Sequence, residues 1–390
     1  MRMNMLMVSA SAVLYGVLAA PGCVGEPTQS VTADSIRVAW RTPLNTEAGG
    51  TPGLQGIAAD AERLYVITRG VAAYDLRTGE QRWHTPNAPA AEPGNGRAPV
   101  NVVTRDGRVF TSGHVARALV AATGAELWTF TPDTAAVAMT AVDERAFYIG
   151  TDSRRVYSLD VATGKPWWSA EVLPRGPYRA VVTGIVPHGD TLYVSLVEET
   201  SPTGHLKRGW IVAVERHEGR VLWRYVNERQ GEAHDAGRHA VAGRIVLVND
   251  LNGGAFLGID RFTGKEVWRH VGPAGLFGAW DVFKVADGIA YVASNDTRVY
   301  AVDPETGRVH WTHELKGSAN SSAVCGEHLF AAAGSLHMLS RSDGKQKAVL
   351  FLDREGFVQP GAFVVSRLLA HGSRVYFVGH NAVYAVECSL

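Results

Sequence analysis

Seven copies of one strand–turn–strand pattern predict an all-β fold, an eight-bladed β-propeller of four-stranded blades. RVYSLDVATGKPWW (155–168) and RVYAVDPETGRVHW (298–311) are close copies, and FLGIDRFTGKEVW (256–268) follows the same plan. The segments between copies alternate apolar and polar residues, as half-buried strands do. Repeats of about 40 residues that hold four strands are typical of propeller blades. The turn glycines of the seven copies are Gly79, Gly124, Gly164, Gly219, Gly264, Gly307 and Gly344.

The sixth copy shows how the four strands arise. Residues 280–287 (WDVFKVAD) predict the innermost strand, and 289–294 (IAYVAS) predict the second after a turn at Gly288. Residues 298–303 predict the third strand, and 308–315 the outer strand. A glycine in the turn between them supplies the positive φ that a tight hairpin needs.

A Trp follows most of these turns, on the outer strand of the blade. Such a side chain buries a large area, so we expect it to cover the seam between neighbouring blades. We therefore interpret these residues as scaffold rather than as parts of an active site. They are Trp40, Trp83, Trp128, Trp168, Trp223, Trp268 and Trp311.

Two incomplete segments predict how the ring closes. VAWRTPL (38–44) has the pattern of an outer strand, yet no repeat precedes it. Residues 363–387 (FVVSRLLAHGSRVYFVGHNAVYAVE) have the pattern of strands one to three of an eighth blade, without the outer strand. We expect the N-terminal strand to pair with NAVYAVE (381–387) and complete this blade. Closure removes a free sheet edge that would otherwise promote aggregation.

The first residues predict export from the cytoplasm. Arg2 precedes an apolar run that ends in small residues before Cys23. Such a run is typical of a secretory signal, and its end resembles a lipoprotein signal, whose Cys is lipidated. A plain signal peptide with a free Cys is the alternative. We expect a signal peptide over 1–22, a lipid-anchor linker over 23–36 and one propeller over 37–390. Position 24 is Val rather than the Asp that retains lipoproteins at the inner membrane, which favours the periplasmic side of the outer membrane.

Composition excludes a nucleic-acid binder and leaves one disulfide open. Lys and Arg together number 38, as do Asp and Glu, so there is no basic excess to bind phosphates. Beyond Cys23 the chain has only Cys325 and Cys388. Both are expected on the tight-turn face of neighbouring blades. One lies on an inner strand and the other further out, however, so the sequence leaves their pairing open.

The repeat A-x-D-x-x-T-G-x-x-x-W resembles the PQQ-like propeller repeat over nearly all of the chain after the signal. With eight blades, N-terminal closure and a lipoprotein-like signal, the chain resembles the BamB family of the outer-membrane β-barrel assembly machinery. The resemblance implies a non-catalytic, monomeric scaffold without a cofactor, which binds the barrel subunit BamA within a complex. Because the same repeat builds other proteins, two alternatives remain. One is a scaffold or ligand-sensing lipoprotein of another envelope complex, and the other is a PQQ-dependent dehydrogenase.

The resemblance also implies a partner-binding loop. In the BamB family a Leu-containing stretch that ends in Arg-Gly, before the fourth blade, contacts the barrel subunit. The equivalent connection reads EVLPRGPYRA (171–180), which places Leu173, Arg175 and Gly176 at the matching positions. This loop is shorter than in the family. It lies on the face where loops are long and irregular, as binding loops often are. On the same face, the insertion 198–209 predicts an extended hairpin.

Polar residues are expected at the mouth of the central channel. They are Arg179, His234, Asp235, Trp280 and Asp281. His234, Asp235 and His239 have the side-chain types of metal ligands, but their spacing matches no strong motif, so we expect no metal and a polar channel lining. Quinoprotein dehydrogenases hold PQQ against a Trp with Ca²⁺ and a catalytic Asp, and many have a disulfide between adjacent cysteines. This chain has no adjacent cysteines, and we expect neither catalytic residues nor bound PQQ.

Overall fold

Eight antiparallel sheets make up the described part of the chain, as the predicted propeller requires. The computed structural model describes residues 35–44, 56–67, 70–86, 101–113, 115–134, 140–200, 207–229, 232–233, 239–250, 254–272, 283–319, 321–351, 367–379 and 382–390. They fall in one unit, Ala33–Leu390. Regular structure in these ranges is all strand, and none of these residues belongs to an apolar helix of membrane-spanning length. The all-β prediction is confirmed.

The first four blades each pair their strands in chain order. The fourth is the longest, with four strands of nine residues each and a short fifth strand. The strands are β2 (Ile57–Ala59), β3 (Arg63–Ile67), β4 (Gly70–Asp75) and β5 (Gln81–Pro86); β6 (Asn101–Arg105), β7 (Arg108–Ser112), β8 (Ala116–Val120) and β9 (Glu126–Phe130); β10 (Ala141–Val142), β11 (Ala146–Gly150), β12 (Arg155–Asp160) and β13 (Pro166–Glu171); and β14 (Ala180–His188), β15 (Thr191–Glu199), β16 (Lys207–Glu215), β17 (Val221–Arg229) and β18 (Glu232–Ala233).

The next three blades repeat this order, and the eighth differs. Its outer strand is the first strand of the chain, β1. The strands are β19 (His239–Ala242), β20 (Ile245–Asp250), β21 (Ala255–Asp260) and β22 (Glu266–Val271); β23 (Lys284–Ala286), β24 (Ile289–Ala293), β25 (Arg298–Val302) and β26 (Val309–Glu314); β27 (Ser321–Cys325), β28 (His328–Ala332), β29 (Leu336–Ser340) and β30 (Gln346–Leu350); and β31 (Leu369–His371), β32 (Arg374–Val378) and β33 (Ala382–Glu387) with β1 (Val38–Pro43).

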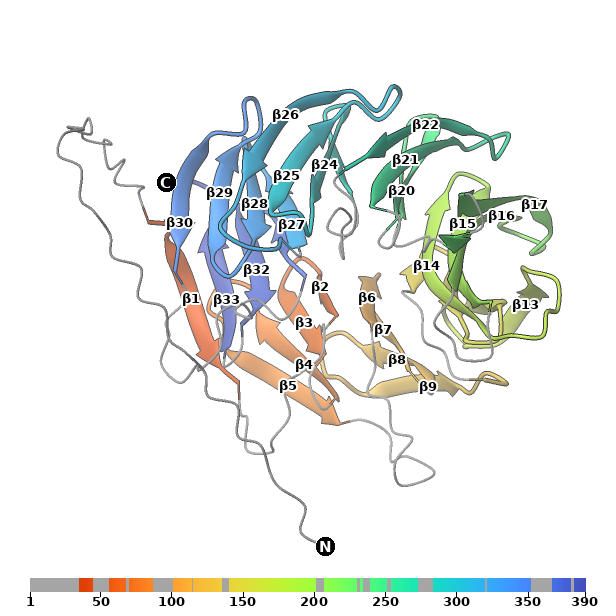
Figure 1. The fold of residues 1–390 in the computed structure, drawn as a ribbon. Coiled ribbons are helices and arrows are strands. Elements are labelled where there is room, and N and C mark those ends of the chain that lie inside the picture. The colour runs from red at the N-terminus through yellow and green to blue at the C-terminus, as the bar shows by residue number, and fades with distance from the viewer. Residues whose placement is uncertain are drawn as a thin grey trace, which may run out of the picture. The chain divides into compact units, whose positions relative to one another are not determined.

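The innermost strands form a closed ring. Each contacts the innermost strand of the next blade, in the order β2, β6, β10, β14, β19, β23, β27, β31 and back to β2. Buried aliphatic and aromatic side chains fill the spaces between neighbouring blades, in clusters that each combine two sheets. One propeller of eight blades is therefore confirmed (Figure 1).

The ring closes through the N-terminal strand, as predicted. β1 pairs antiparallel with β33, with Trp40 opposite Ala385 and Pro43 opposite Ala382, and the two lie side by side in Figure 1. Ile36, which the sequence interpretation assigned to the linker, is only 2% exposed and belongs to a core cluster. The packed propeller therefore includes this residue as well.

A repeated contact, here called the Trp–Gly clasp, joins seven pairs of neighbouring blades. The outer-strand Trp packs on the turn glycine of the next blade, where a Cβ would lie 2.5–2.7 Å from the indole ring. The indole Nε1 donates to a backbone carbonyl of the same turn at 2.9–3.1 Å. The glycine thus serves both the positive φ of the turn and the close approach of the ring. The pairs are Trp40–Gly79, Trp83–Gly124, Trp128–Gly164, Trp168–Gly219, Trp223–Gly264, Trp268–Gly307 and Trp311–Gly344.

Cys325 and Cys388 form a disulfide, with their Cα atoms 5.8 Å apart. The sequence left this pairing open because β27 is an inner strand and β33 is not. The structure shows why the reach suffices. Cys388 lies just beyond β33, and its N–H donates to Ser373 O in the turn that joins the two inner strands of the eighth blade. This brings its Cα within the span of a disulfide.

His239 gives the fold a pH dependence. This side chain at the start of β19 is 2% exposed; its Nε2 lies 2.8 Å from Tyr193 O, so Nε2–H donates, while Nδ1 is buried without a hydrogen-bond partner. Burial lowers the pKa of His239 to about 4, against about 6.5 in the unfolded chain. Between these values the unfolded chain binds more protons, so the free energy of unfolding is expected to fall as the pH drops from 6.5 to 4, by about 3 kcal/mol in total.

Urea unfolding at pH 7 and pH 4.5 measures this loss. Because Gln can donate to the same carbonyl without titrating, His239→Gln is expected to show a smaller loss than the wild type. Burial also lowers the pKa of His313 and His337, and the difference between the two proteins removes their contribution. Equal losses would contradict the assignment to His239.

Candidate functional site

The loop between β13 and β14 is held at both ends by one residue, Arg154. The Arg154 N–H donates to Ala180 O at 2.8 Å, and the Val172 N–H donates to Arg154 O at 3.0 Å. The guanidinium Nη2 of Arg154 also donates to Tyr178 O inside the loop. Arg154 is 9% exposed and has a φ of +59°, which is uncommon for a residue other than glycine. These hydrogen bonds therefore fix the loop to the third blade.

Leu173 does not lie on the surface of this loop. Its side chain is 2% exposed and packs in the core cluster of the third and fourth blades, with Val172, Ala180 and Leu196. The sequence interpretation, drawn from the family resemblance, placed Leu173 at a partner contact. In the structure its side chain is covered, so it anchors the loop from inside.

Arg175 is the most exposed charged group of the loop. Its side chain is 82% exposed, and its Nε and Nη2 donate to the two carboxylate oxygens of Glu171 at 3.2 and 2.9 Å. Glu171 also accepts from Arg155 Nη2 at 2.8 Å. Hydrogen bonding to Arg175, with Arg155 beside it, lowers the pKa of Glu171. Glu171 therefore stays ionised and pairs with the Arg175 guanidinium at the surface.

The extended fourth blade lies against the other side of the loop. β15 and β16 pair as far as Glu199 opposite Lys207, which confirms the predicted long hairpin. The Glu199 N–H donates to Arg179 O at 2.8 Å, and a Cβ on Gly176 would lie 3.2 Å from Glu198 Oε1. Gly176 therefore sits where the loop meets this blade.

Of the predicted channel-mouth residues, the structure describes Arg179. It is exposed, and its Nη2 donates to Asp152 Oδ2 at 2.7 Å. His234, Asp235, Trp280 and Asp281 lie outside the described residues, as does Cys23. Among the described residues no group of three or more His, Cys, Asp or Glu is arranged to hold a metal ion.

The sequence interpretation missed Arg154 and its role at the loop. An Arg at a position of positive φ has no sequence signal, because the turn before β12 carries neither Gly nor Asn there. The Arg154-Arg155 pair is visible in the sequence, but the contacts of Arg154 are made with the loop 172–179, which follows β13.

The fold and loop define the class: an eight-bladed propeller of PQQ-like repeats with a fixed charged loop on one face. A family model described as outer membrane protein assembly factor BamB matches residues 111–195 and 207–389, and the chain belongs to this family.

Individual relatives are distant. BamB from Moraxella catarrhalis superimposes with a TM-score of 0.62 at 17% identity, over 91% of this chain and 98% of that one. Quinohemoprotein alcohol dehydrogenase from Comamonas testosteroni gives 0.69 at 16% identity, over 90% of this chain and 76% of that one. Tetrathionate hydrolase of Acidithiobacillus ferrooxidans is 23% identical over 249 residues, or 58% of this chain, and the match spans only 47% of its own length. Similarities at these identities show the fold alone.

Proposed function

We propose that this chain is a non-catalytic scaffold of the cell envelope, which assists outer-membrane β-barrel assembly by binding a protein partner through the loop 172–179. The observation that carries the proposal is the loop's construction. An 82% exposed Arg175 projects from a segment whose two ends are hydrogen-bonded to one buried residue, Arg154. A partner that meets a fixed loop loses less conformational entropy than one that must order it.

The charges around Arg175 allow it to leave Glu171 and pair with a group of a binding partner. Arg175 uses Nε and Nη2 for Glu171, and its guanidinium has a further Nη1 that can donate to a carboxylate or carbonyl. When Arg175 turns to a partner, Glu171 keeps Arg155 as its own partner. Neither charge is then left alone, which lowers the electrostatic cost of binding.

The family and the N-terminal sequence support a proposal for where the chain acts and what it binds. We propose that Cys23 carries a lipid that anchors the chain to the outer membrane on its periplasmic side. The proposed partner is the periplasmic part of the barrel subunit BamA. Binding then occurs on the propeller face that carries the loop 172–179 and the extended hairpin of β15 and β16.

Charge reversal at Arg175 tests this function. Arg175→Glu is expected to weaken binding to the purified periplasmic domains of the barrel subunit at least about tenfold, or about 1.4 kcal/mol, because it removes the cation and places a second carboxylate beside that of Glu171. Calorimetric titration measures the dissociation constant.

Lys345→Glu is the matched control. Lys345 is 77% exposed and paired with Asp343, and it lies in the turn before β30, away from the loop. This variant is expected to bind like the wild type. Equal affinity of the wild type and Arg175→Glu would contradict the contact. Saturable binding of PQQ with Ca²⁺ to the same preparation would instead favour the dehydrogenase.

A further inference from the structure

The seam between the seventh and eighth blades has no Trp–Gly clasp among the described residues. In the other seven blades a small residue of the third strand lies opposite the Trp. In the seventh blade the sizes are exchanged, with Met338 opposite Ala348. The pairs in the other blades are Ala385–Trp40, Ala73–Trp83, Ala118–Trp128, Ser158–Trp168, Ala213–Trp223, Gly258–Trp268 and Ala301–Trp311.

The eighth blade also differs at the position where a clasp would dock. Its third and fourth strands, β33 and β1, come from distant parts of the sequence, so no hairpin turn joins them. The residues that follow β33 are Cys388, Ser389 and Leu390.

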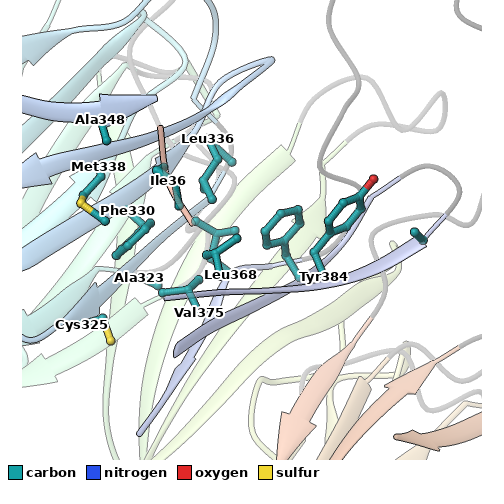
Figure 2. Packing of buried hydrophobic residues seen from close by; sticks show 14 residues of the cluster. Ile36, Ala323, Cys325, Phe330, Leu336, Met338, Ala348, Leu368, Val375 and Tyr384 are labelled. Carbon is teal, nitrogen blue, oxygen red and sulfur yellow. The ribbon is translucent and has the colours of Figure 1, made fainter. Parts of the chain in front are cut away.

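An apolar cluster fills this seam instead (Figure 2). It combines Met338 and Ala348 of the seventh blade with Val386 of the eighth, all fully buried. Ile36, just before β1, is 2% exposed and belongs to the same cluster. The Glu387 N–H donates to Arg37 O at 2.9 Å, next to Ile36. The closing strand therefore contributes directly to this seam.

The disulfide crosses the same seam. Cys325 ends β27, the innermost strand of the seventh blade, and Cys388 follows β33 of the eighth. His328 Nδ1 lies 2.8 Å from Cys388 O, which adds a polar contact between the same two blades. Cys325 is 4% exposed, while Cys388 is partly exposed, so a small reductant has access from the Cys388 side.

We propose that the Cys325–Cys388 disulfide replaces the missing clasp and makes this seam a redox-sensitive joint of the propeller. Dithiothreitol supplies two electrons and two protons, the S–S bond becomes two thiols, and the reductant closes to its own cyclic disulfide. The eighth blade then loses its disulfide cross-link to the seventh blade and keeps its Trp40–Gly79 clasp to the first. Reduction therefore lets the eighth blade, with β1, open locally.

Hydrogen exchange of the folded protein with and without dithiothreitol tests this proposal. Amides of β1, β27, β31 and β33 are expected to exchange at least tenfold faster after reduction, while those of β11, β12 and β15 keep their rates. The melting temperature is expected to fall by about 5 °C. Because the folded, oxidised protein is reduced in place, no refolding is needed.

The variant Cys325→Ser with Cys388→Ser is the control. It is expected to show the exchange pattern of the reduced wild type and no response to dithiothreitol, although Cys23 remains. Unchanged exchange in the reduced wild type would overturn the proposal. So would equal acceleration in all blades, since the disulfide would then act only on global unfolding. A response of the double variant would assign the effect to Cys23 and also overturn it.

Discussion

Deletion of residues 38–44 is expected to destabilise the propeller by about 5 kcal/mol or more. The deletion removes the pairing of β1 with β33 and the clasp of Trp40 on Gly79. It also exposes the edge of β33, a strand of mostly apolar residues whose free edge promotes aggregation. Thermal unfolding and light scattering measure the two effects.

Two companion samples separate the causes. Trp40→Ala keeps the strand and loses the clasp, so it is expected to lie between the wild type and the deletion. A synthetic peptide of residues 35–44, added to the deletion variant, is expected to restore part of the lost stability by occupying the free edge. A melting temperature that the deletion leaves unchanged would contradict closure by β1.

Gly264→Ala is expected to destabilise the protein by at least about 2 kcal/mol more than Gly288→Ala. Both glycines have a positive φ, +69° and +75°, so both substitutions introduce similar backbone strain, about 1–2 kcal/mol. They differ in their surroundings. A Cβ on Gly264 would lie 2.7 Å from the Trp223 ring, whereas nothing lies within 4 Å of a Cβ on Gly288.

Urea unfolding of the two variants and of Trp223→Ala measures the clasp. Trp223 is half-buried, and its loss is expected to destabilise the protein by about 3 kcal/mol. Because the two single changes disrupt one contact, Gly264→Ala combined with Trp223→Ala is expected to fall well short of their sum. Equal effects of Gly264→Ala and Gly288→Ala would show that the clasp contributes little.

The blades were predictable because each strand pattern recurs, and a strand missing from one repeat could be matched with an unpaired strand elsewhere. The hairpin turns between the third and outer strands were predictable because they need a positive φ, which glycine adopts most readily, as at Gly264. Ring closure followed from counting outer strands, and the pairing of Trp40 with Ala385 confirms it.

The candidate loop was only partly predictable. Leu173 stands beside Val172 in a stretch too short to have a periodicity, so nothing in the sequence distinguishes a covered from an exposed Leu. In the structure both are buried. Arg175 was identified through family resemblance. Its ion pair with Glu171 joins residues four apart in the chain, but the anchoring by Arg154 depends on a contact between the third and fourth blades.

The pairing of Cys325 with Cys388 also could not be predicted from the sequence. Strand order placed Cys325 and Cys388 on different strands of neighbouring blades, at a separation that pattern alone does not define. What brings Cys388 within reach is its hydrogen bond to Ser373 O beyond the end of β33. In the seventh blade Met338 stands where the other blades have a small residue, and Ala348 stands where they have a Trp. Both differences are visible in the sequence, but only the register of the two strands shows that these residues face each other.

The most direct test of the scaffold proposal is affinity purification of the tagged full chain from detergent-solubilised envelopes, with the bound proteins identified by mass spectrometry. The wild type and Lys345→Glu are predicted to recover the barrel-assembly subunit, and Arg175→Glu is predicted to lose it. Recovery of a different envelope complex, retained by Arg175→Glu, would contradict both the assembly role and the contact loop.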